Sequence, residues 1–220
     1  MKINEKLQQW KEYSKMSDLG IIARRKFFNN AFDGALTCAG IVSGIFILFL
    51  VEPSTFEAKD ILITGFATAL AIGISGLWGA FLSEQAERKK KVIDMKKDMA
   101  EIEEETEESE LKNIENNFKK ENKKRPRTLL EKAEKFATIV ASLVDGGAPV
   151  LGSSLPLIPF FFGAPLTLLH FIFSYVVLAG LLVYLGIFLG QISGGGRLRY
   201  AMHLITAGVV TLIVSVLLGI

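Results

Sequence analysis

The sequence predicts an all-α, polytopic membrane protein with five transmembrane helices and a cytoplasmic helical insertion. Of the 220 residues, 50% are hydrophobic, which is too apolar for an ordinary soluble domain of this length. A spanning helix needs about 20 mostly apolar residues. Five stretches of the chain meet this requirement, at roughly residues 28–51, 61–83, 136–162, 165–190 and 199–220. Most charged residues gather instead in residues 1–26 and 84–135, outside these stretches.

Residues 1–27 form a predicted lead-in to the first span. Ile3, Leu7, Trp10 and Tyr13 recur at helical spacing among Lys, Glu and Gln. This pattern is typical of an amphipathic helix on a membrane surface, and it also fits a solvated lead-in. No apolar core is followed by a small-residue cleavage site, so we predict no cleaved signal peptide.

Residues 28–83 hold the first two spans, and the charges beside the spans predict the topology. The connection EPSTFEAKD at 52–60 is net acidic. The basic groups fall on the other side if the spans alternate: Arg24, Arg25, Lys26, the run KKRPR at 123–127, Arg197 and Arg199. By the positive-inside rule the N-terminus is cytoplasmic and the C-terminus is outside. We expect a multi-pass protein of the lipid bilayer, in the cell membrane of a prokaryote.

Residues 84–135 form the predicted insertion, in which acidic residues recur at alternating steps of three and four. Seven of the eight positions in this register are acidic, and the exception is Lys91. The eight residues are Glu84, Glu87, Lys91, Asp94, Asp98, Glu101, Glu105 and Glu108. Such a stripe fits a solvated helix face. It also fits a site for divalent cations, because carboxylate oxygens bind hard and borderline metal ions. Our candidate metal ligands are Glu84, Glu87, Asp98, Glu101, Glu105 and Glu108.

Residues 136–220 hold the last three spans, and their first stretch repeats a motif of span one. FDGALTCAG at 32–40 and VDGGAPVLG at 144–152 each place an aspartate before a glycine. An aspartate at the centre of a spanning helix costs about 2.5–3.5 kcal/mol and usually faces a bundle interior or an ion path. Two carboxylates at one cavity would release protons when a divalent cation binds. The candidate transport-path residues are Asp33, Gly34, Thr37, Asp145, Gly146 and Pro149.

Each aspartate also has a structural interpretation. Asp33 fits an interfacial helix position, and Asp145 fits the cap of a broken helix. Pro149 has no N–H to donate to the carbonyl of Asp145, and Pro156 and Pro159 follow, so we predict a broken or kinked helix. Broken helices at membrane depth are typical of transporter binding sites.

The remaining chemistry-bearing residues predict little. The single cysteine, Cys38, excludes an internal disulfide and fits a small packing residue. His170 and His203 lie at or near span ends, where satisfied histidines are common. The pairs Gly40/Gly44 and Gly186/Gly190 permit close helix packing. We expect no tightly bound cofactor and no nucleic-acid partner.

Three segments together resemble the vacuolar iron transporter family, also called the CCC-one-like family. They are RRKFFNNAFDGALTCAGIVSGIF, GAFLSEQAERKK and DGGAPVLGSSLPLIPFF. The resemblance implies a homodimer of five-span protomers that exports ferrous iron or manganese from the cytosol in exchange for protons. It matches Asp33 to the family's translocation-path aspartate, and Glu84 and Glu87 to the first acids of its cytoplasmic metal-binding domain. We therefore expect a transporter of divalent metal ions rather than an enzyme.

Two other classes fit parts of the pattern. A membrane scaffold or regulatory protein would use the helical segment 84–123 to bind a partner. An intramembrane di-aspartyl protease also needs two buried acids. The protease is disfavoured because the glycine-x-glycine that we would require immediately before its aspartate is absent.

Overall fold

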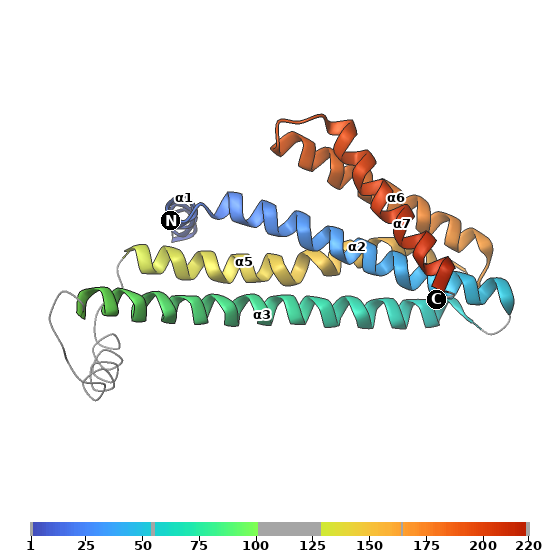
Figure 1. Ribbon diagram of the computed structural model, residues 1–220, viewed down its shortest axis with the longest axis horizontal. Helices are drawn as coiled ribbons and strands as arrows, with labels where there is room; N and C mark the ends of the chain where they lie inside the picture. The colour runs from blue at the N-terminus through green and yellow to red at the C-terminus, as the bar shows by residue number, and fades with distance from the viewer. Residues whose placement is uncertain (1, 54–55, 101–128, 164, 219–220) are drawn as a thin grey trace. The chain divides into compact units, whose positions relative to one another are not determined.

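The structure is a computed structural model that describes residues 2–53, 56–100, 129–163 and 165–218 (Figure 1). These residues form α-helices and one 3₁₀ helix, and no strand occurs among them. The elements are α1 (Lys2–Met16), α2 (Leu19–Val51), α3 (Ala58–Ala100), α5 (Leu129–Ser154), η1 (Leu155–Phe161), α6 (Leu168–Ile192) and α7 (Arg197–Leu218). Five helical segments are long and apolar enough to cross a membrane, which confirms the predicted five-span, all-α class.

Several helices extend beyond the predicted spans. α2 begins at Leu19 rather than near residue 28, and α3 continues to Ala100 rather than ending near residue 83. The physical reason is that the residues beyond the apolar stretch of α3 are still good helix formers. The end of α3 is rich in Ala, Glu, Lys and Met and contains no Gly or Pro after Gly79. Most of the predicted insertion, residues 101–128, lies outside the described residues.

The third span changes its helix type later than its first proline suggests. α5 continues through Pro149 to Ser154, and the 3₁₀ helix η1 then covers Leu155–Phe161. η1 has a proline in its first turn and contains Pro159. A single proline removes one backbone hydrogen bond of the helix, whereas closely spaced prolines remove several in succession. The predicted break therefore lies at Leu155.

The chain divides into two compact units, of which the larger comprises residues 21–78 and 141–220. Small residues form much of its core on α2, where Ala31, Ala35 and Ala39 are buried together with leucines of α6. A second cluster joins Cys38 and Val42 of α2 to aromatic residues of η1 and α6. In lipid, helices associate mainly through such close packing of small side chains, because the surrounding acyl chains are as apolar as the core.

α6 and α7 lie side by side in the larger unit as a tight hairpin (Figure 1). A Cβ added at Gly186 would lie 2.6 Å from the backbone N of Ala201, and one at Gly190 would lie 2.7 Å from the Cα of Arg197. Gly194 turns the chain between the helices with a φ of +66°, which favours glycine. The Gly186/Gly190 pair therefore serves packing within the chain.

α5 contacts α2 and α3 backbone to backbone, through five glycines that we call the glycine junction. These residues are Gly34, Gly73, Gly76, Gly146 and Gly152. A Cβ at Gly34 would overlap the carbonyl of Pro149, and one at Gly152 would overlap the carbonyl of Ala31. Toward α3, a Cβ at Gly146 would lie 2.5 Å from the carbonyl oxygen of Gly73. At these contacts the glycines let the helix backbones approach directly.

The smaller unit comprises residues 1–20 and 79–140, and its described part joins α1 to the start of α5. Tyr13 is buried, and its ring centroid lies 5.9 Å from that of Phe136. Trp10 stacks on the same phenylalanine at 5.9 Å but stays 51% exposed. The lead-in is thus a helix. Its placement on a membrane surface stays a prediction.

Adjacent glycines of α5 provide a matched test of the glycine junction. Gly146 meets α3, whereas nothing lies within 4 Å of a Cβ added at Gly147. Gly146→Ala should lower the free energy of unfolding by about 1–3 kcal/mol, because the added methyl group overpacks the junction. Gly147→Ala should leave stability unchanged or raise it by up to about 1 kcal/mol, because alanine is the better helix former. SDS titration of the detergent-solubilised protein, followed by circular dichroism, measures both. Equal stability of the two variants would contradict the close approach.

Candidate functional site

Asp33 lies on a stripe of α2 that the rest of the larger unit leaves partly open. It is exposed, and Thr37 and Gly40, four and seven residues further on, are half-buried. Helical geometry places these three residues on one face. The Thr37 hydroxyl donates a hydrogen bond of 2.9 Å to the backbone carbonyl of Asp33. The Asp33 carboxylate therefore stands on an open stripe of a spanning helix.

Asp145 of α5, unlike the exposed Asp33, is buried and interacts with two residues of α2. Its Oδ2 forms an ion pair with the Nζ of Lys26. Its Oδ1 accepts a hydrogen bond of 2.8 Å from the amide of Asn30, which also donates to the carbonyl of Lys26 at 2.9 Å. The side chain of Asp145 is 10% exposed and that of Lys26 is 33% exposed. The buried carboxylate is thus neutralised and hydrogen-bonded, as burial of a charge requires.

The glycine junction includes the backbone of Asp145 itself. Pro149 cannot donate to the Asp145 carbonyl, and a Cβ at Gly76 would lie 2.6 Å from that oxygen. One turn further along α5, the backbone of Pro149 lies against Gly34. The Ser153 hydroxyl donates to the Pro149 carbonyl at 2.5 Å. Both ends of this turn of α5 therefore pack against neighbouring backbone.

The two predicted aspartates differ in burial, since Asp33 is exposed and Asp145 is buried, but residues close to them in sequence are in contact. Gly34 touches Pro149, and Gly146 touches α3. Asp145 meets α2 at Lys26 and Asn30, which precede Asp33 by about two turns and one turn. Sequence reasoning missed both partners. The available signal was the run RRKFFNN, in which Lys26 and Asn30 are four residues apart and so share a helix face.

The predicted metal ligands of the insertion are only partly described. Glu84 is half-buried and Glu87 is exposed, both on α3. Asp98 belongs to the end of the same helix, whereas Glu101, Glu105 and Glu108 lie outside the described residues. Within the described part of the chain, no three His, Cys, Asp or Glu side chains converge on a metal site. The cation-site hypothesis for residues 84–108 stays a prediction.

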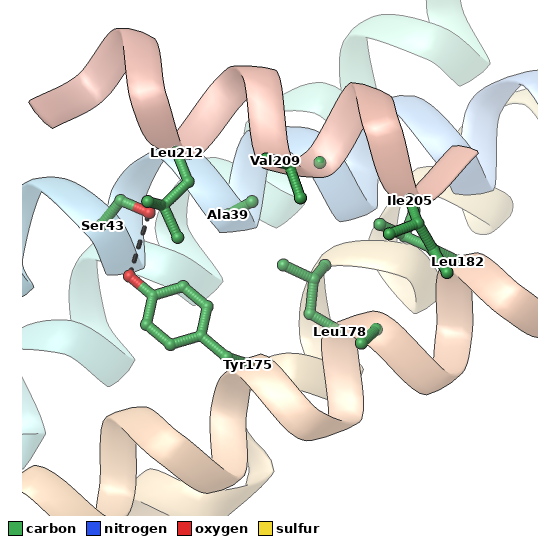
Figure 2. Close-up of a pocket in the computed structure, with 10 residues that line it drawn as sticks. Ala39, Ser43, Tyr175, Leu178, Leu182, Ile205, Val209 and Leu212 are labelled. Carbon is green, nitrogen blue, oxygen red and sulfur yellow. Dashed lines mark hydrogen bonds between the residues drawn. The ribbon is translucent and has the colours of Figure 1, made fainter. Parts of the chain in front are cut away.

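A cavity of about 170 Å³ lies between α2, α6 and α7 (Figure 2). Its polar groups are the hydroxyls of Ser43 and Tyr175, and the tyrosine donates to the serine at 3.0 Å. The other lining residues are Ala39, Leu178, Ala179, Leu182, Ile205, Gly208, Val209 and Leu212. Because none of these ten lining residues has a carboxylate, imidazole or thiol, the cavity offers no metal ligand set.

Five helices long and apolar enough to cross a membrane define a class, the polytopic helical membrane proteins. The VIT family model matches residues 25–220, which is most of the chain, so the chain belongs to the VIT family. Membership places it among membrane metal-ion transporters. An uncharacterized protein of Methanocaldococcus jannaschii, MJ0645, is 26% identical over 161 residues, which cover 73% of this chain and 70% of the relative. α1 precedes the matched region.

Removing the Lys26 side chain should destabilise the protein, because the buried Asp145 carboxylate would lose its counter-ion. Breaking a fully buried pair costs about 3–5 kcal/mol, and the partial exposure of Lys26 reduces the expected loss for Lys26→Met to about 2 kcal/mol. Arg25→Met is the matched control, because Arg25 is the exposed neighbour in the same helix. SDS unfolding titrations give the free energy of unfolding of both variants. A Lys26→Met variant as stable as Arg25→Met would contradict the role of the ion pair.

Proposed function

We propose that this protein moves divalent metal ions, ferrous iron or manganese, out of the cytosol in exchange for protons. Membership of the VIT family supports the class of cargo. The observation that carries the proposal is Asp33, a carboxylate exposed on a spanning helix. A charge at membrane depth is retained where it lines an ion path, because exposure to lipid is costly.

The chemistry of a carboxylate suits this exchange. Its oxygens bind Mn²⁺ and Fe²⁺, which accept oxygen ligands readily. Protonation competes with metal binding for the same oxygens, so an arriving cation displaces a proton and an arriving proton releases the cation. Asp33 in this role alternates between a metal-bound and a protonated state on opposite sides of the membrane.

We further propose that the transporting unit is a homodimer in which the open face of α2 meets its copy. Asp33, Thr37 and Gly40 share this face, and nothing lies within 4 Å of a Cβ added at Gly40. Glycine permits close approach of two spanning helices. Pairing of the two faces would remove Asp33 from lipid and place two carboxylates beside one path.

The charge distribution supports a cytoplasmic N-terminus. Arg24 and Arg25 precede the apolar part of α2, and Arg197 and Arg199 begin α7. Residues 52–60, which join α2 to the start of α3, carry three acidic residues and a single lysine. The positive-inside rule assigns the basic ends to the cytosol. The acidic stripe of residues 84–108 would then face the cytosol, where it could collect cations for export.

Asp33→Asn tests the proposed path directly. Asparagine keeps the size of the side chain but removes its titratable charge, so uptake of Mn²⁺ into acid-loaded proteoliposomes should fall to the level of empty liposomes. Glu52→Gln is the control, because Glu52 is an exposed carboxylate just beyond the far end of the same helix and should be dispensable. Full transport by Asp33→Asn would remove Asp33 from the path.

Gly40→Leu tests the proposed dimer. The protomer has open space at this position, so the variant should fold, but the larger side chain should separate the two copies of α2. Gly180→Leu on α6 is the control, since a Cβ there also meets nothing within 4 Å. Light scattering in mild detergent should find the control dimeric and Gly40→Leu monomeric. A dimeric Gly40→Leu variant would exclude this face as the interface.

A further inference from the structure

The ion pair between Lys26 and Asp145 joins two spanning helices, and alternating access in transporters proceeds largely by movement of one part of the helix bundle against another. We propose that this pair is a latch between α2 and α5, and that Asp145 serves transport as the charge partner of Lys26 rather than as a metal ligand. This inference rests on the proposed function. It assigns a role to Lys26 and gives Asp145 a different task from that of Asp33.

The first argument is the occupancy of the Asp145 carboxylate. Lys26 bonds Oδ2, and Asn30 donates to Oδ1 at 2.8 Å, so each oxygen has a donor from α2. A metal ion could bind here only by displacing an ammonium group that already satisfies the charge. Asp33 is exposed and has no such partner in the structure among the described residues.

The second argument is the difference in mobility between the two partners. The glycine junction packs against the α5 backbone at Asp145 and one turn later at Pro149, through Gly76 and Gly34 respectively. Lys26 carries its charge on a flexible four-carbon stem and is 33% exposed, against 10% for Asp145. Opening therefore consists of withdrawal of the lysine toward solvent, while Asp145 stays in place.

The third argument is the position of the latch relative to the path. Lys26 precedes Asp33 by seven residues on α2, about 10 Å along the helix axis. A divalent cation at Asp33 would repel the Lys26 ammonium, and the low dielectric of the bundle strengthens this repulsion. Metal loading at Asp33 thus favours an open latch.

A charge swap distinguishes a latch from a ligand. The double variant Lys26→Asp with Asp145→Lys restores an ion pair between α2 and α5, and Asn30 can turn its amide to offer the oxygen to the new ammonium. Each single change places like charges together and should abolish Mn²⁺ uptake. The double variant should recover uptake with a KM for Mn²⁺ within about threefold of the wild type, since ground-state metal binding is untouched. Recovery of uptake would not follow from a ligand role, because an ammonium cannot bind Mn²⁺.

A second variant decides the matter if the swapped protein does not fold, as judged by gel filtration. Asp145→Asn keeps a hydrogen-bonding group toward Lys26 and Asn30 and removes the charge. The latch predicts a changed maximal rate with an unchanged KM for Mn²⁺, whereas a ligand role predicts a raised KM. A folded but inactive double variant, or a raised KM for Asp145→Asn, would overturn the latch. Absence of uptake by the wild-type protein would instead overturn the proposed function.

Discussion

The direct backbone contact of α5 with α2 and α3 is the constraint on which the rest of the larger unit depends. Glycines stand at these contacts, so the helix backbones approach one another directly there. In lipid the hydrophobic effect does not drive helices together, and such packing combines with interhelical polar bonds to hold them. The ion pair of Asp145 with Lys26 supplies the polar bond at the same place. Packing and charge thus reinforce each other within two turns of α5.

Two matching sequence motifs have different environments because their helices have different neighbours. VDGGAPVLG lies between α2 and α3, so Asp145 is buried and depends on Lys26 and Asn30. FDGALTCAG contacts α5 through Gly34 and leaves Asp33 exposed. A carboxylate that is already neutralised suits a fixed structural or gating task. An uncovered carboxylate suits exchange between a metal ion and a proton.

Hydropathy was sufficient to predict the five spans, because a bilayer requires long apolar helices. It did not predict the helix ends, since α3 continues into charged residues that are good helix formers. The close approach at Gly34 and Gly146 was foreseeable from the missing side chains. The partners of Asp145 were not, because a single sequence does not say which face of α2 meets α5. The acids Glu101, Glu105 and Glu108 lie outside the described residues, so their role rests on spacing and resemblance alone.

The central claim, exchange of a divalent metal ion for protons, is tested most directly by recording both ions in the same vesicles. Purified protein is reconstituted into acid-loaded liposomes that contain one dye for Mn²⁺ and one for pH, and Mn²⁺ is added outside. The account predicts that Mn²⁺ entry and a rise in internal pH begin together, and that both are absent from protein-free liposomes. Mn²⁺ entry without any change of internal pH would contradict the exchange, and absence of entry would contradict transport itself.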